Sequence, residues 1–263
     1  MANGNTLLDA RDVTIRFGGL TAVSHFNLAI QPHELVGLIG PNGAGKTTVF
    51  NMLTGVYKPT EGQIFVGGTS THEFKPYQIT ALGVSRTFQN IRLFKELSVL
   101  DNVKIGGHIH YTYSSASAVL KTNQFLDAEE AAEREAVELL RIFGLEERSA
   151  YYAKNLPYGD QRRLEIARAL AVRPKLLLLD EPAAGLNDRE TRDLMQTIHD
   201  IRDRFDIAIL VIEHNMELVM GICERIIVLS FGKTIAQGTP AEVRANPVVI
   251  EAYLGEPAEA AGV

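Results

Sequence analysis

Residues 35–48 read LVGLIGPNGAGKTT, and their pattern indicates the architecture of the chain. Leu35 to Ile39 form a nearly continuous apolar run, as expected of a strand that is buried on both faces. Gly40 to Thr47 match the P-loop pattern G-x-x-x-x-G-K-S/T, and a helix follows that is predicted to end near Gly55. A strand, a glycine-rich turn and a helix in this order predict an α/β domain.

This turn is suited to hold phosphate groups. Its glycines let consecutive backbone N–H groups point inward around phosphate oxygens, and the helix adds its positive N-terminal end. Lys46 is predicted to reach the β- and γ-phosphates of ATP, and the Thr47 hydroxyl is predicted to bind Mg²⁺. An ordinary glycine-rich turn is the alternative, but the required strand and helix flank this motif. The residues predicted to bind ATP on this basis are Gly40, Pro41, Asn42, Gly43, Ala44, Gly45, Lys46, Thr47 and Thr48.

A second apolar run, Leu176 to Leu179, leads into Asp180 and Glu181. Because the carboxyl ends of parallel strands meet at one edge of a sheet, ligands bind there. Asp180 fits the acidic residue that holds Mg²⁺ in P-loop NTPases, and Glu181 fits a residue that polarises the attacking water. A solvated strand end is the alternative for these carboxylates, but the unbroken leucines and the P-loop argue against it.

A third apolar run, Ile207 to Ile212, leads into Glu213 and His214. A histidine is most often a satisfied structural residue. Its position at the end of a third strand nevertheless favours a place in the same site. We therefore include His214 among the candidate site residues.

Composition narrows the classes of function. The chain has 263 residues, a formal net charge of −6 and a pI near 5.7, which argues against broad electrostatic binding to nucleic acid or anionic lipid. Cys223 is the single cysteine, so no disulfide within the chain is possible, as suits a reducing cytosol. The first residues show no secretory signal, and the apolar runs are far shorter than the roughly 20 residues that span a bilayer. Any role at a membrane is therefore expected to depend on a partner.

The remaining segments predict a small antiparallel sheet and a helical insert. Val13, Ile15 and Phe17 alternate as in a strand, and Glu61 to Gly68 are typical of an antiparallel strand between turns. From about Asn90 to Leu164 the pattern is helical. We expect an ATP-binding α/β core with the antiparallel subdomain at 1–89 and 165–263, and a helical subdomain at 90–164.

Local signals divide the insert further. Asp127 and Glu130 have the spacing of a capping box, so a helix is predicted to begin there. One apolar face follows, which comprises Ala132, Ala136, Leu139, Leu140 and Phe143. At the other end of the chain, the residues after Gly255 are expected to fray.

Residues 156–170 read LPYGDQRRLEIARAL, a turn that leads into a basic helix. Asp160 is the expected cap of this helix. The helix N-terminus carries N–H groups that suit an anion, so it raises the question of which phosphate it faces.

With these motifs in place, the chain resembles the ATP-binding subunits of ABC transporters over essentially its whole length. GPNGAGKTT is similar to the Walker A motif of the family, and LLLLDEP is similar to its Walker B motif with the glutamate that acts in catalysis. The resemblance implies that Gln89 in RTFQN is the Q-loop glutamine, which also contacts Mg²⁺, and that His214 in IEHN is the switch histidine. It places Phe17 under the adenine ring, although the alternation with Ile15 fits a core residue equally.

LPYGDQRR occupies the place of the LSGGQ signature, which in this family faces the γ-phosphate of ATP held by a second subunit. The resemblance thus assigns Tyr158, Gly159 and Asp160 to the ATP of the other subunit. Pro157 replaces the serine of the signature and has neither a hydroxyl nor an N–H group, so Gly159 and neighbouring N–H groups must do the binding. Asn187 in AGLN likewise stands where the family often has an aspartate.

The resemblance is strongest to subunits of branched-chain amino acid importers, through DEPAAGLN, IEHNMELVMGICERIIVL and GTPAEVRANPVVIEAYLG. It implies a P-loop, RecA-like fold with a mainly parallel sheet and ATP hydrolysis with Mg²⁺. The implied partners are a second ATP-binding subunit of the same or a related chain, two membrane-spanning permease subunits and, indirectly, a substrate-binding protein. The implied location is the cytoplasmic face of the membrane, with residues 91–97 of the helical insert against the permease.

The residues leave three alternative functions open. An ATPase of another importer or of a lipid exporter is the nearest alternative. A soluble ATPase of this family that acts on DNA or ribosomes predicts heptad arms or a basic surface, and the sequence has neither. A P-loop kinase gives no role to the signature region or to His214.

Overall fold

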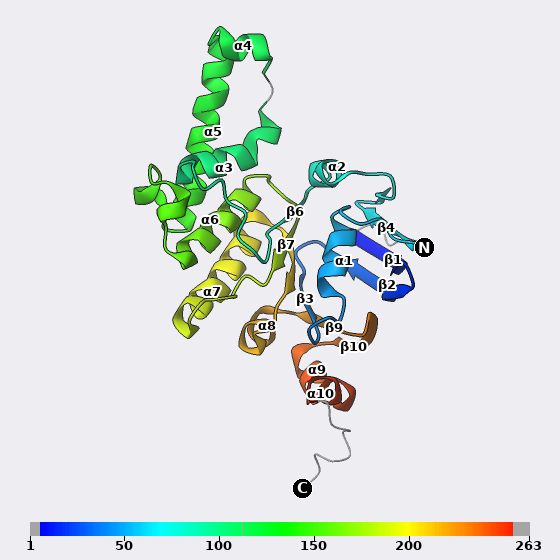
Figure 1. The fold of residues 1–263 in the computed structure, drawn as a ribbon. Coiled ribbons are helices and arrows are strands. Elements are labelled where there is room, and N and C mark those ends of the chain that lie inside the picture. The colour runs from blue at the N-terminus through cyan, green and yellow to red at the C-terminus, as the bar shows by residue number, and fades with distance from the viewer. Residues whose placement is uncertain (1–5, 112, 255–263) are drawn as a thin grey trace. The chain divides into compact units, whose positions relative to one another are not determined.

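The computed structural model describes residues 6–111 and 113–254. The chain divides into two compact units, one of residues 1–86 with 175–263 and one of residues 87–174 (Figure 1). The sequence places the ends of the helical insert at 90 and 164 instead. Residue 164 lies inside α6 (Tyr158–Leu170), and a division there would cut through the hydrogen bonds of one helix. The expected fraying after Gly255 falls outside the described residues.

The larger unit contains a six-stranded sheet in the order β10, β9, β3, β8, β7, β6. These strands span Lys233–Gly238, Arg225–Ser230, Leu35–Ile39, Ala208–Ile212, Leu176–Asp180 and Val84–Arg86 in that order. All neighbouring pairs are parallel except β9 with β10. Every residue of β3, β7 and β8 is buried, which confirms the mainly parallel sheet predicted from the three apolar runs.

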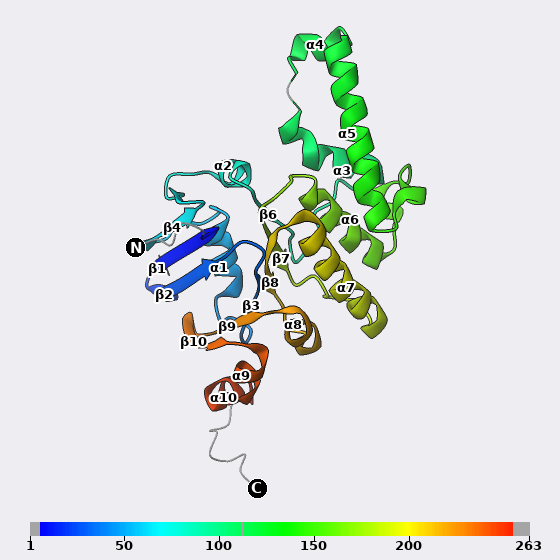
Figure 2. The same ribbon diagram turned by 180° about the vertical axis from the view of Figure 1, so that it is seen from behind.

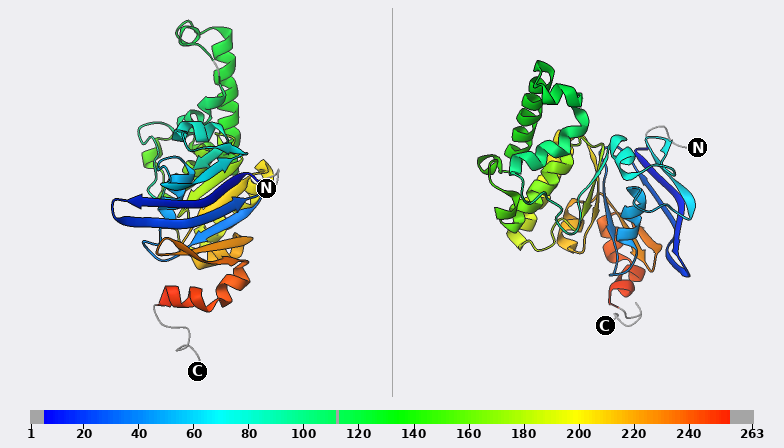
Figure 3. Two further views of the ribbon diagram at one scale, coloured as in Figure 1. Left: turned by 90° about the vertical axis from the view of Figure 1, so that its right-hand side faces the viewer. Right: turned by 45° about the horizontal axis from the view of Figure 1, so that its top comes forward.

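A four-stranded antiparallel sheet completes the β structure of this unit, in the order β2, β1, β4, β5. Its strands span Leu20–Ile30, Leu8–Phe17, Glu61–Val66 and Thr69–Ser70 in that order. Figure 3 shows the long hairpin of β1 and β2 along its length. The predicted antiparallel subdomain is therefore confirmed.

The core of the larger unit joins the two sheets through α1 (Lys46–Leu53). Val49, Phe50 and Met52 of this helix are buried in one apolar cluster with side chains of both sheets. The other helices of the unit are α2 (Pro76–Ala81), α7 (Asp188–Phe205), α8 (Met216–Ile222), α9 (Pro240–Ala245) and α10 (Pro247–Leu254). The helix that carries the phosphate-binding turn is thus fixed by packing on both sheets.

The smaller unit is helical. Its helices are α3 (Val99–Gly107), α4 (Ser115–Val119), α5 (Asn123–Ile142) and α6, with short 3₁₀ turns at His108–His110, Glu146–Arg148 and Ala153–Asn155. Figure 2 shows α4 next to the N-terminal end of the long helix α5.

The apolar face predicted for the long helix is buried, but the predicted helix start is wrong. Ala136 and Leu140 of α5 are almost completely buried, as expected. The N-cap residue, however, is Thr122, whose carbonyl accepts the N–H group of Leu126 at 3.0 Å. Asp127 consequently lies within the helix. The capping-box pattern at Asp127 does not mark the helix start, because α5 begins four residues earlier, at Asn123.

Candidate functional site

The P-loop connects β3 to α1 and leaves no space for side chains at two of its glycines. A Cβ atom on Gly40 would lie 2.0 Å from the carbonyl oxygen of Leu229 on the neighbouring strand β9. One on Gly45, at φ +101°, would lie 2.9 Å from the carbonyl oxygen of Ala22. The loop backbone therefore packs closely against these two carbonyl groups, and only glycine fits at both positions. The N-terminus of α1 follows the loop directly.

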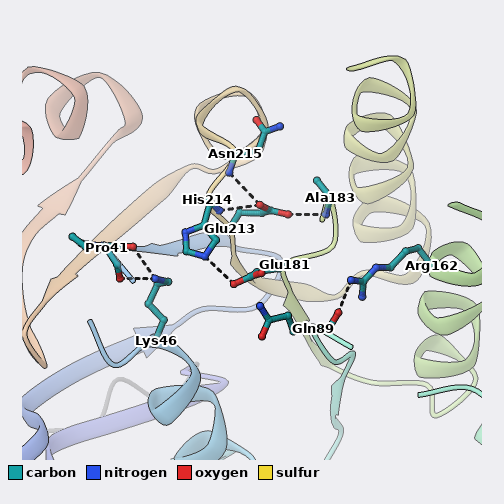
Figure 4. Close-up of polar contacts among 10 residues, drawn as sticks. Pro41, Lys46, Gln89, Arg162, Glu181, Ala183, Glu213, His214 and Asn215 are labelled. Atoms are coloured by element: carbon teal, nitrogen blue, oxygen red, sulfur yellow. Dashed lines mark hydrogen bonds and ion pairs between the residues drawn. The ribbon is translucent and has the colours of Figure 1, made fainter. Parts of the chain in front are cut away.

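Lys46 is buried and folded back onto its own loop (Figure 4). Its Nζ donates hydrogen bonds to the carbonyl oxygens of Gly40 at 2.7 Å and Pro41 at 2.9 Å. Burial lowers the pKa of this ammonium group, whereas the nearby carboxylates of Glu181 and Asp180 act to raise it. The structure thus brings the predicted phosphate-binding lysine into the electrostatic range of both predicted carboxylates.

Asp180 is the last residue of β7 and forms a buried ion pair. Its Oδ2 accepts a hydrogen bond from the Arg86 guanidinium at 2.6 Å, and both side chains are less than a tenth exposed. Arg86 ends the neighbouring strand β6 and also donates to Oδ1 of Asn51 on α1 at 2.7 Å. Arg86 was not predicted as a site residue, because its contact with Asp180 depends on which strand lies beside β7.

Glu181 and His214 meet across the same sheet edge. The Nε2 atom of His214 lies 2.8 Å from Oε1 of Glu181 (Figure 4). Strands β7 and β8 pair so that Asp180 is opposite Ile212, which places the residues that follow them side by side. Glu181 has the left-handed φ of 48°, which is unusual for a residue with a side chain, and its N–H group donates to the carbonyl of Ile212 at 2.9 Å.

Three residues that the sequence places in the site lie at the start of a helix in the smaller unit. Tyr158, Gly159 and Asp160 form the first turn of α6, after Pro157 as the N-cap residue. The expected capping role of Asp160 is wrong, since Pro157 is the N-cap residue and Asp160 lies within the first turn. The Asp160 carboxylate instead pairs with Arg148, which precedes the turn.

The same helix holds the backbone of the predicted Q-loop. The buried guanidinium of Arg162 donates to the carbonyl oxygen of Phe88 at 2.9 Å and to that of Gln89 (Figure 4). It also donates to the hydroxyl oxygen of Tyr158 at 3.0 Å. Within the smaller unit, one arginine therefore connects the Gln89 backbone to the turn of Tyr158.

The sequence matches two known protein-family models. Residues 23–184, which carry the P-loop, Gln89, the α6 turn and Asp180–Glu181, match the model described as ABC transporter. The chain belongs to the ABC transporter family. Residues 233–259 also match the model described as branched-chain amino acid ATP-binding cassette transporter. The resemblance stated from the motifs is confirmed, and so is the ATPase activity that it implies.

Individual relatives of this ABC subunit agree with the family. It is 51% identical to the high-affinity branched-chain amino acid transport ATP-binding protein LivG of Escherichia coli (strain K12), over 95% of this chain and 98% of that protein. A crystal structure of the ADP conformation of an ABC-transporter ATP-binding cassette matches with a TM-score of 0.82 and 28% identity, over 95% and 99% of the two chains. A dimeric structure of a bacterial ABC transporter cassette matches with a TM-score of 0.75 and 26% identity, over 89% and 98%.

Phe17 of the ABC subunit is not a core residue, although it alternates with Val13 and Ile15. Its side chain is 44% exposed, whereas Ile15 is buried. Phe17 is the last residue of β1, and it pairs with Leu20, which is also exposed. The Phe17 ring meets the ring of Tyr57 edge to face, with 5.2 Å between the centroids. A role under adenine stays a prediction for Phe17, and Tyr57 is a neighbour that the sequence did not reveal.

Two further observations concern metal ligands and membrane-spanning helices in the described residues. Within residues 6–111 and 113–254, no cluster of three or more His, Cys, Asp or Glu side chains could hold a metal ion. Mg²⁺ in nucleotide enzymes is bound by one or two protein oxygens and by the phosphates, so this finding is compatible with Mg²⁺. No described helix is long and apolar enough to cross a membrane.

Proposed function

We propose that this chain is the ATP-hydrolysing subunit of an importer of branched-chain amino acids. The observation that carries the hydrolytic part is the contact of His214 with Glu181, at the sheet edge that also holds Lys46. The substrate class is supported by the family model at residues 233–259 and by the relative LivG, whose name states branched-chain amino acid transport.

ATP binding uses the P-loop of the larger unit. Inward N–H groups and the N-terminus of α1 bind the phosphates, and Lys46 exchanges its bonds to the Gly40 and Pro41 carbonyls for phosphate oxygens. Thr47 and Asp180 supply hard oxygen ligands that fit Mg²⁺, and Gln89 is proposed as a further contact. When bound, Mg²⁺ neutralises charge that develops on the β- and γ-phosphates. Phe17 offers an exposed ring for the adenine.

Hydrolysis is assigned to Glu181 and His214. The Glu181 carboxylate polarises the water that attacks the γ-phosphate. An ionised carboxylate only accepts hydrogen bonds, so the proton in the 2.8 Å contact belongs to Nε2 of His214. His214 thereby holds the carboxylate in one orientation, and it can turn the same N–H group toward a phosphate oxygen once ATP is bound.

The turn of α6 is assigned to ATP on a second subunit. The N–H groups of Tyr158, Gly159 and Asp160 lie in the first turn and have no acceptor within the helix, so they are available to an anion. The dimeric cassette among the similar structures supports pairing of two subunits. In the assembled importer, two such subunits would bind two permease subunits peripherally at the cytoplasmic face. A substrate-binding protein would act on the outer side.

The test is transport by the purified assembly. The chain is co-expressed with its neighbouring permease genes, the complex is reconstituted in vesicles with ATP, and uptake of radiolabelled leucine is measured with and without the binding protein. We expect leucine uptake to be lost in Lys46→Ala and kept in the control Lys58→Ala, because the side chain of Lys58 is exposed and pairs with Glu73, outside the P-loop. Uptake of an unrelated solute, or export of lipid, would contradict the proposed substrate class.

A further inference from the structure

Glu213, the residue before His214, is a buried carboxylate that the mechanism above does not use. It follows β8 directly, and its side chain is 3% exposed. Oε1 accepts the backbone N–H of Ala183 at 2.6 Å. Oε2 accepts the backbone N–H groups of His214 at 2.9 Å and Asn215 at 3.1 Å. Figure 4 shows this carboxylate between the three donors.

The three donors belong to two different loops. Ala183 lies in the loop after β7, two positions beyond Glu181, whereas His214 and Asn215 belong to the loop after β8. Each oxygen of the Glu213 carboxylate therefore serves one loop. The backbone of both loops is joined through one side chain, in parallel with the Glu181–His214 contact between their functional groups.

A carboxylate suits this place better than any neutral side chain. Two oxygens are needed to accept three N–H groups from opposite sides, and hydrogen bonds to an ionised acceptor are shorter and stronger than neutral ones. A glutamine would offer one oxygen and one NH₂ group, so one loop would face a donor and leave a buried N–H group unsatisfied. The left-handed backbone of Glu181 adds a reason, because such a conformation persists only when its surroundings hold it.

We infer that Glu213 is a positioning residue of ATP hydrolysis, which holds the Glu181 loop and the His214 loop at the spacing that their contact requires. The inference rests on the proposed roles of Glu181 and His214. It assigns no contact with ATP to Glu213, whose oxygens are occupied by the three backbone donors.

The first experiment compares Glu213→Gln with Glu217→Gln in the complete transporter complex. Glu217 is an exposed residue of α8. Glu217→Gln removes one negative charge close to Glu213 and is therefore the matched control. Glu213→Gln should lower kcat about 10- to 100-fold, the effect of a displacement of about 1 Å near the reacting groups. The KM and the calorimetric Kd for ATP should stay within about threefold, since the P-loop is untouched. Glu217→Gln should match the wild type. Unchanged kcat, or a loss of ATP binding equal to the loss of kcat, would overturn the inference.

A double-mutant cycle separates positioning from general structural support. In His214→Ala, the contact that Glu213 is inferred to maintain is already absent. Glu213→Gln should therefore lower kcat by a much smaller factor in this background than in the wild type. An equal cost in both backgrounds would mean that Glu213 does not act through His214. If Glu213→Gln does not fold, Glu213→Asp takes its place. It keeps the charge but is one methylene shorter, and it should lower kcat by a smaller factor.

The same set of variants tells the two proposals apart. If Glu181→Gln and His214→Ala keep the turnover of the wild type, the proposed hydrolytic roles are wrong and Glu213 has nothing to position. If those variants lose turnover while Glu213→Gln keeps it, only the inference on Glu213 is wrong.

Discussion

The Nε2 atom of His214 lies 2.8 Å from Oε1 of Glu181, although 33 positions separate the two residues in the chain. The parallel pairing of β7 with β8 causes this proximity, because it sets the ends of the two strands level. The imidazole of His214 is 40% exposed, whereas the side chain of Glu181 is only 14% exposed. A polarising carboxylate that is partly shielded from water and held by a hydrogen bond fits the task of orienting a single water molecule.

The ion pair of Arg86 with Asp180 should make a large contribution to folding. Arg86→Met removes the cation of a buried ion pair, which should lower the free energy of unfolding by about 3–5 kcal/mol. Urea denaturation followed by circular dichroism measures this change. Arg134→Met, which breaks the exposed pair with Glu130 on α5, is the control and should leave the midpoint nearly unchanged. An equal midpoint for Arg86→Met and the wild type would show that the buried pair does not support the fold.

Some of these features could be predicted from the sequence, and others could not. The parallel sheet followed from local information, because strands buried on both faces, such as β3, are nearly continuous apolar runs. The placement of Glu181 and His214 at one sheet edge followed from their strands, whereas the contact between their side chains was not predicted. The pairing of Arg86 with Asp180 did not, because it requires the strand order that sets β6 beside β7.

Other features could not be predicted because two local signals competed or because a partner came from another loop. In the sequence, Glu213 resembles an ordinary polar strand end, and the role proposed for it depends on an N–H group from the loop after β7. Asp127 carries a valid capping pattern that an earlier helix start overrules. Phe17 continues the alternation of β1, but it is the last residue of the strand and pairs with the exposed Leu20, and alternation alone does not show where burial ends along a strand.

The exposed ring of Phe17 should matter for the base of ATP and not for its phosphates. Phe17→Ala should weaken ATP binding by about 1–3 kcal/mol, the range for a base stacked on an aromatic ring. Binding of inorganic tripolyphosphate, which has no base, should stay the same. Isothermal titration calorimetry with both ligands measures the difference. If tripolyphosphate weakens as much as ATP, the substitution has disturbed the P-loop and stacking by Phe17 is not supported.

The first turn of α6 should serve the nucleotide of another subunit. Gly159→Glu adds bulk and negative charge to the helix N-terminus, where a γ-phosphate is proposed to approach. The isolated variant should bind ATP like the wild type, yet the assembled complex should not hydrolyse it.

Mixing gives the control if the chain forms homodimers. Lys46→Ala keeps this turn and loses the P-loop lysine, whereas Gly159→Glu has the opposite defect. Mixed dimers contain one site with both halves intact, so ATPase activity should return in a mixture of the two inactive variants. With a related partner chain, Gly159→Glu should instead disable the nucleotide site of the partner. Loss of ATP binding by the isolated Gly159→Glu protein would refute the role in trans.

Single-turnover hydrolysis by Glu181→Gln in the assembled transporter decides whether Glu181 polarises the attacking water. The variant should bind ATP with the affinity of the wild type, because Lys46 and the loop glycines are unchanged. Its rate of phosphate release should fall by about 10²–10⁴-fold, the range for the loss of a general base. Glu217→Gln, an exposed change of the same charge, should hydrolyse ATP at the rate of the wild type. A Glu181→Gln complex that releases phosphate as fast as the wild type would contradict the assignment of hydrolysis to Glu181 and His214.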